Sequence, residues 1–278
     1  MPRTERALAR QQGFTLIEAV MVIAITGVVI AMVSIFIVPA TTAYFASGAR
    51  AQLGDQADTA LRRIARDLAL ALPNSARVSP SGLSLELIPV SGAARYATDS
   101  GNPLQFGVID AGFDIVGPAL RLSHASQRLA WYNLGAGIPD ADAYTLSNVR
   151  TSTSAAGNAT TVGITGAALP NALLAPPYRV YAIEPPVSYR CDLTARTLTR
   201  YSGYGFVATQ PDPPSGGTAA VLARNVSACT FSFNAGAVAA RYGLVTLQLS
   251  LSSSQNVSLS DGGETVSLYQ AVHVDNLP

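Results

Sequence analysis

Residues 13–40 read GFTLIEAVMVIAITGVVIAMVSIFIVPA, and Glu18 is the only ionisable side chain within them. An uncharged stretch of this length can cross a bilayer as a helix, which needs about 20 apolar residues. Three arginines precede it within residues 3–10, and such a basic flank stays on the cytoplasmic side of a membrane. The sequence therefore predicts one membrane-spanning helix, with the N-terminus in the cytoplasm and the chain from residue 41 onward outside.

The carboxylate of Glu18 needs a partner, because a charge inside an apolar membrane helix costs about 2.5–3.5 kcal/mol. No residue of the helix itself can provide one. Cleavage between Gly13 and Phe14 would create a partner, since the new amine of Phe14 could meet the Glu18 of a neighbouring copy. Two other interpretations stay open, an uncleaved signal anchor and a secretory leader cut after its apolar core. A core of about 25 residues is long for such a leader.

The segment Gly13–Glu18 resembles the prepilin processing motif of type IV pilins and of type II secretion pseudopilins. In that family a membrane peptidase cuts after the glycine and methylates the new amino terminus, and the glutamate aligns subunits during filament assembly. The resemblance implies cleavage after Gly13, N-methylation of Phe14 and a role in assembly for Glu18. It also implies the partners, which are the prepilin peptidase, the inner membrane, and the major and other minor pilins of a filament.

The composition limits what the rest of the chain can be. With 278 residues, it has room for a membrane helix and one domain of about 200 residues, or two smaller ones. Charged residues make up only 13% and hydrophobic residues 49%, which excludes a disordered polyelectrolyte and is typical of a β-rich extracytoplasmic domain. The net charge of +1 gives no basic footprint, so no nucleic-acid partner is expected.

One long helix is predicted over residues 14–72. Pro39 lies inside it, and because proline lacks a backbone donor, a kink or local melting is expected there. From residue 53 apolar side chains recur at spacings of three and four, the pattern of an amphipathic helix; they are Leu53, Ala57, Leu61, Ile64, Leu68 and Leu72. Pro73 and Asn74 are expected to end the helix.

After Pro73 the apolar period changes from 3.6 to 2, which indicates strands. The predicted fold class is α+β, with a long N-terminal pilin helix whose amphipathic second half packs on an antiparallel β-sheet domain. The expected segments are a cytoplasmic leader (1–13), a transmembrane and assembly half of the helix (14–40), its amphipathic half (41–72) and a periplasmic β-rich domain (73–278). Residues 150–177 are rich in Thr, Ser, Ala, Gly and Pro, and predict a surface loop or a joint between two lobes.

A second resemblance narrows the family. Residues 57–78 look like the MshO group of minor pilins, from the MSHA (mannose-sensitive haemagglutinin) type IV pilus. Related stretches occur in PilW-type minor pilins and in the J-type minor pseudopilin of type II secretion. Residues 243–251 and 267–276 are similar to MshO-type termini, so the resemblance covers residues 13–78 well and about 178–278 moderately.

The chain has two cysteines, Cys191 and Cys229, and neither has a CxxC or histidine neighbour at metal spacing. A zinc site is therefore not expected. In an oxidising periplasm a disulfide between them is expected, and closing that loop would stabilise the fold by about 4 kcal/mol. Two buried thiols are the alternative.

Candidates for other chemistry are few. They are His124 and His273 as bases, Asp140 with Asp142 and Asp261 with Glu264 as cation ligands, and Tyr201, Tyr204 and Phe206 as a contact patch. No Gly-x-Ser-x-Gly elbow supports a catalytic triad, and pairs of acids without a ladder of further ligands give little support for calcium. We expect no catalytic residue, no metal site and no cofactor, in a protein that is not an enzyme.

Together these features predict a minor pilin-like structural subunit of an MSHA-type type IV pilus, processed by prepilin peptidase and assembled through its N-terminal helix. It would cross the inner membrane once, with its C-terminal domain in the periplasm, before entering a pilus or pseudopilus. The alternatives are the J-type pseudopilin of type II secretion and a membrane-anchored periplasmic enzyme or adhesin.

Overall fold

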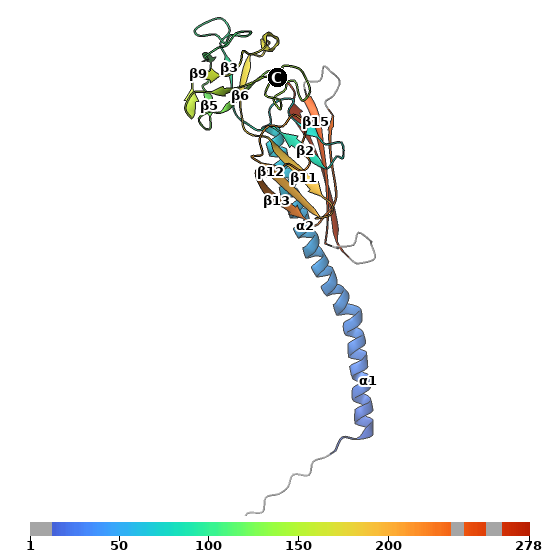
Figure 1. Cartoon of the computed structure of the whole chain (residues 1–278). Coiled ribbons are helices and arrows are strands. Elements are labelled where there is room, and N and C mark those ends of the chain that lie inside the picture. Colours follow the sequence, from blue (N-terminus) through green and yellow to red (C-terminus); the bar gives the residue numbers. More distant parts are fainter. Residues whose placement is uncertain (1–12, 235–241, 254–262) are drawn as a thin grey trace, which may run out of the picture. The chain divides into compact units, whose positions relative to one another are not determined.

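The computed structural model describes residues 13–234, 242–253 and 263–278. The chain divides into two compact units, one ending at Ala49 and the other beginning at Arg50 (Figure 1). The boundary falls within a helix, α2 (Val38–Ala69). Each unit is described by itself.

The first unit is helical. Helix α1 (Leu16–Met32) begins after Thr15, whose side chain accepts a hydrogen bond from the backbone N–H of Glu18 at 3.3 Å. This is an N-cap, which satisfies one of the amide donors that a helix leaves free in its first turn. The helix therefore begins at Leu16, two residues after Phe14, where the sequence placed its start.

A π-helical turn, η1 (Val33–Ile37), separates α1 from α2. Pro39 follows this turn directly, in the first residues of α2. Because proline donates no hydrogen bond and its ring crowds the preceding turn, the regular α-helical ladder is interrupted at this place. The hydroxyl groups of Thr41 and Thr42 donate to the carbonyls of Ile37 and Pro39, at 3.1 and 2.9 Å.

Helix α2 ends at Ala69 and not at Leu72, so the expected end of the amphipathic half was three residues too late. The reason is pairing with a distant segment. The N–H of Leu72 donates to the carbonyl of Ile88 at 2.7 Å, and the N–H of Val90 donates to the carbonyl of Leu70 at 2.9 Å. These bonds hold residues 70–72 in extended pairing before Pro73 is reached.

The second unit contains a five-stranded antiparallel sheet in the order β1-β2-β11-β12-β13. Its strands are β1 (Arg77–Val78), β2 (Ser84–Leu87), β11 (Val187–Asp192), β12 (Thr197–Ser202) and β13 (Thr218–Arg224). A three-stranded antiparallel sheet follows in the order β14-β15-β16. Its strands are β14 (Val226–Asn234), β15 (Tyr242–Ser252) and β16 (Thr265–Asp275).

The apolar stripe of α2 packs against both sheets, as the α+β prediction required (Figure 1). One buried cluster contains Leu53, Ala57, Leu61, Ile64 and Leu68 from the helix together with Leu85, Tyr189 and Leu198 from the first sheet and Phe231, Leu247 and Leu249 from the second. Fully burying each large apolar side chain contributes about 1.5–3 kcal/mol. The period of the stripe thus identified the buried face of the helix. Leu72 belongs to a separate cluster that includes Ile88 and Tyr181.

Between β2 and β11 the chain forms a closed six-stranded barrel in the order β10-β3-β4-β9-β7-β6. Its strands are β3 (Val90–Tyr96), β4 (Gly112–Val116), β6 (Arg128–Trp131), β7 (Val149–Ser152), β9 (Thr161–Thr165) and β10 (Arg179–Ile183). A small pair, β5 (Leu120–Leu122) with β8 (Gly157–Ala159), and a 3₁₀ turn, η2 (Asn171–Leu173), complete it. Its interior cluster is separate from that around α2, and includes Tyr96, Phe113 and Trp131.

The segment 150–177 is therefore not a long loop or a joint, because β7, β8, β9 and η2 lie wholly or largely within it. These strands were missed in the sequence because glycine carries no side chain that would mark a strand period. Gly112 pairs with Gly163 across β4 and β9, and a Cβ on Gly112 would lie 2.8 Å from the carbonyl oxygen of Val162. Only a residue without a side chain permits that approach.

Candidate functional site

The processing motif lies in open chain ahead of α1. Residues 13–15 are not helical, a Cβ on Gly13 would meet nothing within 4 Å, and the side chain of Phe14 is 81% exposed. No other described part of the chain covers the Gly13–Phe14 bond. The backbone at this bond is thus open to a protease, as cleavage after Gly13 would require.

Glu18 lies in the first turn of α1. Its backbone N–H donates to Thr15, but its carboxylate has no hydrogen bond or ion pair among the described residues. The N-terminus of a helix carries a partial positive charge that favours a carboxylate there. This is weaker than a paired cation, so the described residues leave the carboxylate of Glu18 without a full partner.

The surface of α1 is apolar on all sides, and none of its residues is buried by the chain. Within the described part of the chain, one helical run, Leu16–Ala69, is long and apolar enough to cross a membrane, with a mean hydropathy of 2.9 in its most apolar window. A helix that is hydrophobic all round requires either a protein core or a lipid environment around it. The described residues supply no such core around α1.

The C-terminal part of α2 is fixed to the five-stranded sheet through Asp67. One oxygen of this carboxylate accepts hydrogen bonds from the hydroxyl of Tyr189 on β11 and from Arg200 Nε on β12, the latter at 3.2 Å. The other oxygen lies 3.4 Å from Arg63 Nε. Burial raises the pKa of the Tyr189 phenol, which therefore stays protonated and able to donate.

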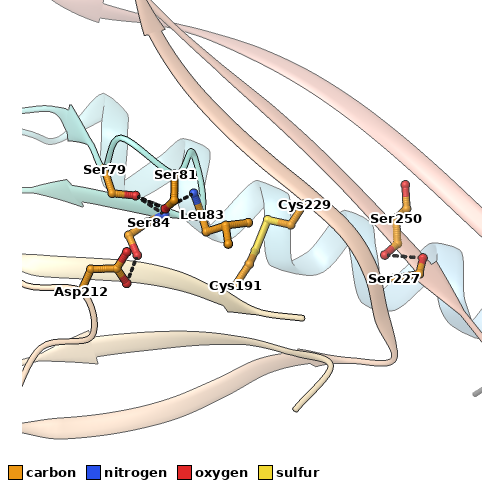
Figure 2. The surroundings of a disulfide bond; sticks show 9 residues. All are labelled: Ser79, Ser81, Leu83, Ser84, Cys191, Asp212, Ser227, Cys229 and Ser250. Carbon is orange, nitrogen blue, oxygen red and sulfur yellow. Dashed lines mark hydrogen bonds between the residues drawn. A yellow bond between two sulfur atoms is a disulfide. The ribbon is translucent and has the colours of Figure 1, made fainter. Parts of the chain in front are cut away.

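The two sheets around α2 are joined covalently. Cys191 on β11 and Cys229 on β14 form a disulfide, and both residues lie in the buried cluster around the helix. Figure 2 shows the bond bridging between strands near Leu83. The backbone of Leu83 accepts a hydrogen bond from the N–H of Cys191 at 2.9 Å.

Two of the four acidic candidates of the sequence, Asp142 and Glu264, are bonded within the fold, and Asp140 is exposed. The two carboxylate oxygens of Asp142 accept hydrogen bonds from the backbone of Gly137 and Tyr144, at 2.9 and 2.8 Å. Glu264 is paired with Arg50 at 2.6 Å, and Asp261 lies outside the described residues. Across the residues with a described position, no group of three or more histidine, cysteine or acidic residues is placed to hold a metal ion.

Both histidines are exposed. His124 Nε2 lies 3.3 Å from the carboxylate of Glu184, and His273 is exposed on β16. Neither lies beside a serine or cysteine with which it is hydrogen-bonded in the described structure, so the arrangement of a nucleophile and its base is not formed there.

A buried ion pair was not foreseen. Glu86 lies in β2 and is fully buried. Arg77 Nε donates to it at 2.6 Å and the hydroxyl of Tyr204 donates at 2.7 Å. Arg77 also donates to the carbonyls of Val207 and Ala208, so the pair holds the segment after β12 over the sheet.

Two of the three aromatic candidates, Tyr204 and Phe206, are packed or bonded within the domain, and Tyr201 lies half-buried on β12. Tyr204 is bonded to Glu86, and Phe206 packs on a buried cluster with the guanidinium of Arg128 4.8 Å from its ring centre. No local sequence pattern indicated the burial of Glu86, because the segment that covers it lies more than 100 residues further along the chain.

Comparison with known families gives one match. The family model described as a prokaryotic N-terminal methylation motif matches residues 8–34. No curated protein and no solved structure matches the chain. The matched residues include Gly13, Phe14 and Glu18, and the motif supports a type IV pilin-like protein. It implies processing by prepilin peptidase and assembly with other pilins in a family of structural subunits, and with the apolar helix it fits a membrane-anchored pilin.

Proposed function

We propose that the chain is a minor pilin-like structural subunit of an MSHA-type type IV pilus, matured by cleavage after Gly13 and by N-methylation of Phe14. The observation that carries this proposal is the methylation motif at the head of an apolar helix that the chain itself does not bury. An anchor without a filament role would need neither the motif nor the intramembrane carboxylate.

The precursor would insert with its leader, residues 1–13, in the cytoplasm and its β-rich domain, residues 73–278, in the periplasm. Residues 14–40 would hold it in the inner membrane and then transfer sideways into the filament. The basic leader favours this orientation. The surface of the helix changes from apolar on all sides in α1 to a single apolar stripe that begins at Leu53, which supports a membrane half followed by a half bound to the domain.

Assembly would depend on a pair of charges that exists only after cleavage. The new amine of Phe14 is a cation at the start of α1, and Glu18 is the anion one turn later. In apolar surroundings an unpaired carboxylate is costly, whereas a carboxylate in contact with an ammonium group is not. Subunits in correct register would satisfy both groups, and subunits out of register would leave both charges unpaired.

The assignment to the MSHA pilus rests on the MshO-like residues 57–78 and on a domain larger than that of a typical major pilin. The J-type pseudopilin of type II secretion is the alternative within the same class. Deletion of the gene, with separate measurement of surface pili and of secreted exoproteins, would distinguish them. Loss of pili with normal secretion supports the pilus, and the reverse result supports the secretion system.

The decisive experiment is to determine the mature N-terminus, by intact mass and N-terminal peptide sequencing, in cells with and without prepilin peptidase. We expect N-methyl-Phe14 only when the peptidase is present. A chain that still begins at Met1, or that is cut beyond about residue 40 as a secretory leader would be, would overturn the proposal.

A further inference from the structure

A groove lined by arginines lies between α2 and the edge of the five-stranded sheet. It has a volume of about 360 Å³ and is lined by Thr59, Ala60, Arg62, Arg63, Arg66 and Leu222. The helix contributes the first five of these residues and β13 contributes the last. All lie within the second unit, so the groove does not depend on the placement of the membrane helix.

The charges of the groove are not balanced within the chain. Arg62 pairs with Asp58 at 2.6 Å and Arg63 lies 3.4 Å from Asp67. Arg66 is exposed and has no ion-pair or hydrogen-bond partner among the described residues. The lining itself contains three guanidinium groups and no carboxylate, so it attracts an anion.

Arg63 adds a donor that the fold leaves unused. Its Nε is buried and makes no hydrogen bond within the described structure, although the ion-pair distance to Asp67 is met. A buried donor without an acceptor costs free energy. A carboxylate that enters the groove could accept hydrogen bonds from Arg66, which is unpaired, and from Arg62 and Arg63. Guanidinium groups offer carboxylates a forked pair of donors.

The wall opposite the arginines is a strand edge that is open except at its end, where the backbone N–H of Arg224 donates to Gln56 Oε1 at 3.4 Å. β13 is hydrogen-bonded to β12 on one side, and no described strand pairs with its other side. Thr218, Ala219, Ala220 and Val221 are all exposed. Such an edge presents unpaired N–H and C=O groups, and extended peptides bind to edges of this kind by adding a strand.

We infer that this groove is a docking surface for an extended acidic segment of a partner protein, which adds to the edge of β13 and places its carboxylates on Arg62 and Arg66. Successive side chains of an added strand point to opposite faces. An acidic residue at every second position would therefore place all of its carboxylates toward the arginines. Ala60 and Leu222 are the apolar residues in the lining of the groove.

A protein segment fits these features better than a lipid phosphate does. Both carry negative charge, but a lipid headgroup has no backbone to pair with the strand edge. The inference does not depend on prepilin processing, because no residue of the groove belongs to the processing motif.

The test uses the full chain in uncharged detergent micelles and a labelled peptide of about ten residues that alternates threonine and glutamate. Binding is followed by fluorescence anisotropy. We expect the double variant Arg62→Gln, Arg66→Gln to bind this peptide at least tenfold more weakly than the original protein does. The original protein should bind a matched peptide that alternates threonine and glutamine tenfold more weakly than the glutamate peptide. The control variant Arg95→Gln, Arg121→Gln changes two exposed arginines of the barrel region and should bind as the original does.

Backbone pairing is tested with two further peptides, one N-methylated at every threonine and the other at every glutamate. One of the two should lose binding, because methylation removes the N–H groups that face β13. Equal binding of the glutamate and glutamine peptides, or full binding to the double variant, would overturn the inference. So would arginine-dependent binding of phosphatidylglycerol micelles without peptide binding, or loss of self-association in the double variant, which would make a second copy the occupant.

Discussion

Cys191 on β11 is bonded to Cys229 on β14, so one covalent link joins the two sheets against which the apolar face of α2 packs. The two residues are 38 positions apart in the chain. A loop of that size restricts the unfolded chain by an amount worth about 4 kcal/mol.

Replacing both cysteines by serine should therefore lower the free energy of unfolding by about 2–5 kcal/mol. The measurement is urea unfolding of the full chain in micelles, followed by near-UV circular dichroism. Adding a reductant to the unaltered protein is the control, and it should reproduce most of the loss. An unchanged urea unfolding midpoint in both samples would mean that the disulfide does not stabilise the fold.

The carboxylate of Glu18 has no partner within the described chain. Glu18→Ala should leave cleavage after Gly13 intact and reduce incorporation into sheared filaments at least about tenfold, which corresponds to the loss of about 1.4 kcal/mol per subunit contact. Immunoblots of sheared and cell fractions measure the incorporation, and N-terminal sequencing measures the cleavage.

Met21→Ala is the matched control for Glu18, since it changes an exposed apolar side chain of the same helix without changing charge. It should assemble normally. Normal assembly of the Glu18→Ala variant would contradict the pairing mechanism and favour a plain membrane anchor.

The pKa of Glu86 is raised above its ordinary value, mainly by burial and against the opposing effect of Arg77. The folded protein therefore binds a proton more tightly here than the unfolded chain does, so this group's contribution to stability falls as the pH rises above about 4.5. Glu86→Gln removes the titration. The free energy of unfolding of the variant should therefore increase relative to that of the original protein as the pH rises from 4 to 7.

Urea unfolding of both proteins at several pH values in that range gives the difference directly. A difference that shifts the opposite way would mean that the attraction of Arg77 outweighs the cost of burial. Tyr204→Phe is a useful companion, because it removes one donor to Glu86 without adding a charge.

Ile64 is fully buried at the centre of the α2 stripe. Ile64→Ala should destabilise the domain by about 2–5 kcal/mol, from lost burial and the cavity left behind. Asp55→Ala, on the exposed face of the same helix, should change stability by less than about 0.5 kcal/mol. Thermal unfolding of the two variants provides the comparison, and equal effects would contradict the packing of this stripe.

Gly112 allows β4 to approach β9 closely. Gly112→Ala should cost about 1–3 kcal/mol through steric overlap, and the fluorescence of the buried Trp131, the only tryptophan, reports on the same barrel core. Gly54→Ala is the opposite case, because its Cβ would meet nothing within 4 Å inside a helix. It should stabilise by about 0.5–1 kcal/mol. A neutral Gly112→Ala would mean that the two strands separate at little cost.

The sequence alone determined the features that depend on neighbouring residues. The apolar run of α1, the interruption near Pro39 and the stripe of α2 are all periodic or compositional signals within one segment. The longest strands, β14, β15 and β16, carry a local signal of the same kind, because alternation over nine or more residues leaves little ambiguity. The turn before β12 is also local, since Asp192 accepts hydrogen bonds from the backbone N–H groups of Thr194 and Ala195, only two and three residues away.

Only the tertiary structure decided the features that depend on residues far apart in the chain. The helix ends at Ala69 because Leu70 and Leu72 pair with the segment around Pro89. The barrel strands in residues 149–165 are short and rich in Gly, Ser and Thr, so backbone pairing defines them and no side-chain period announces them. The burial of Glu86 and the arginine groove beside β13 likewise arise from long-range packing, and local sequence patterns carry no record of which distant segment will cover a residue or leave it open.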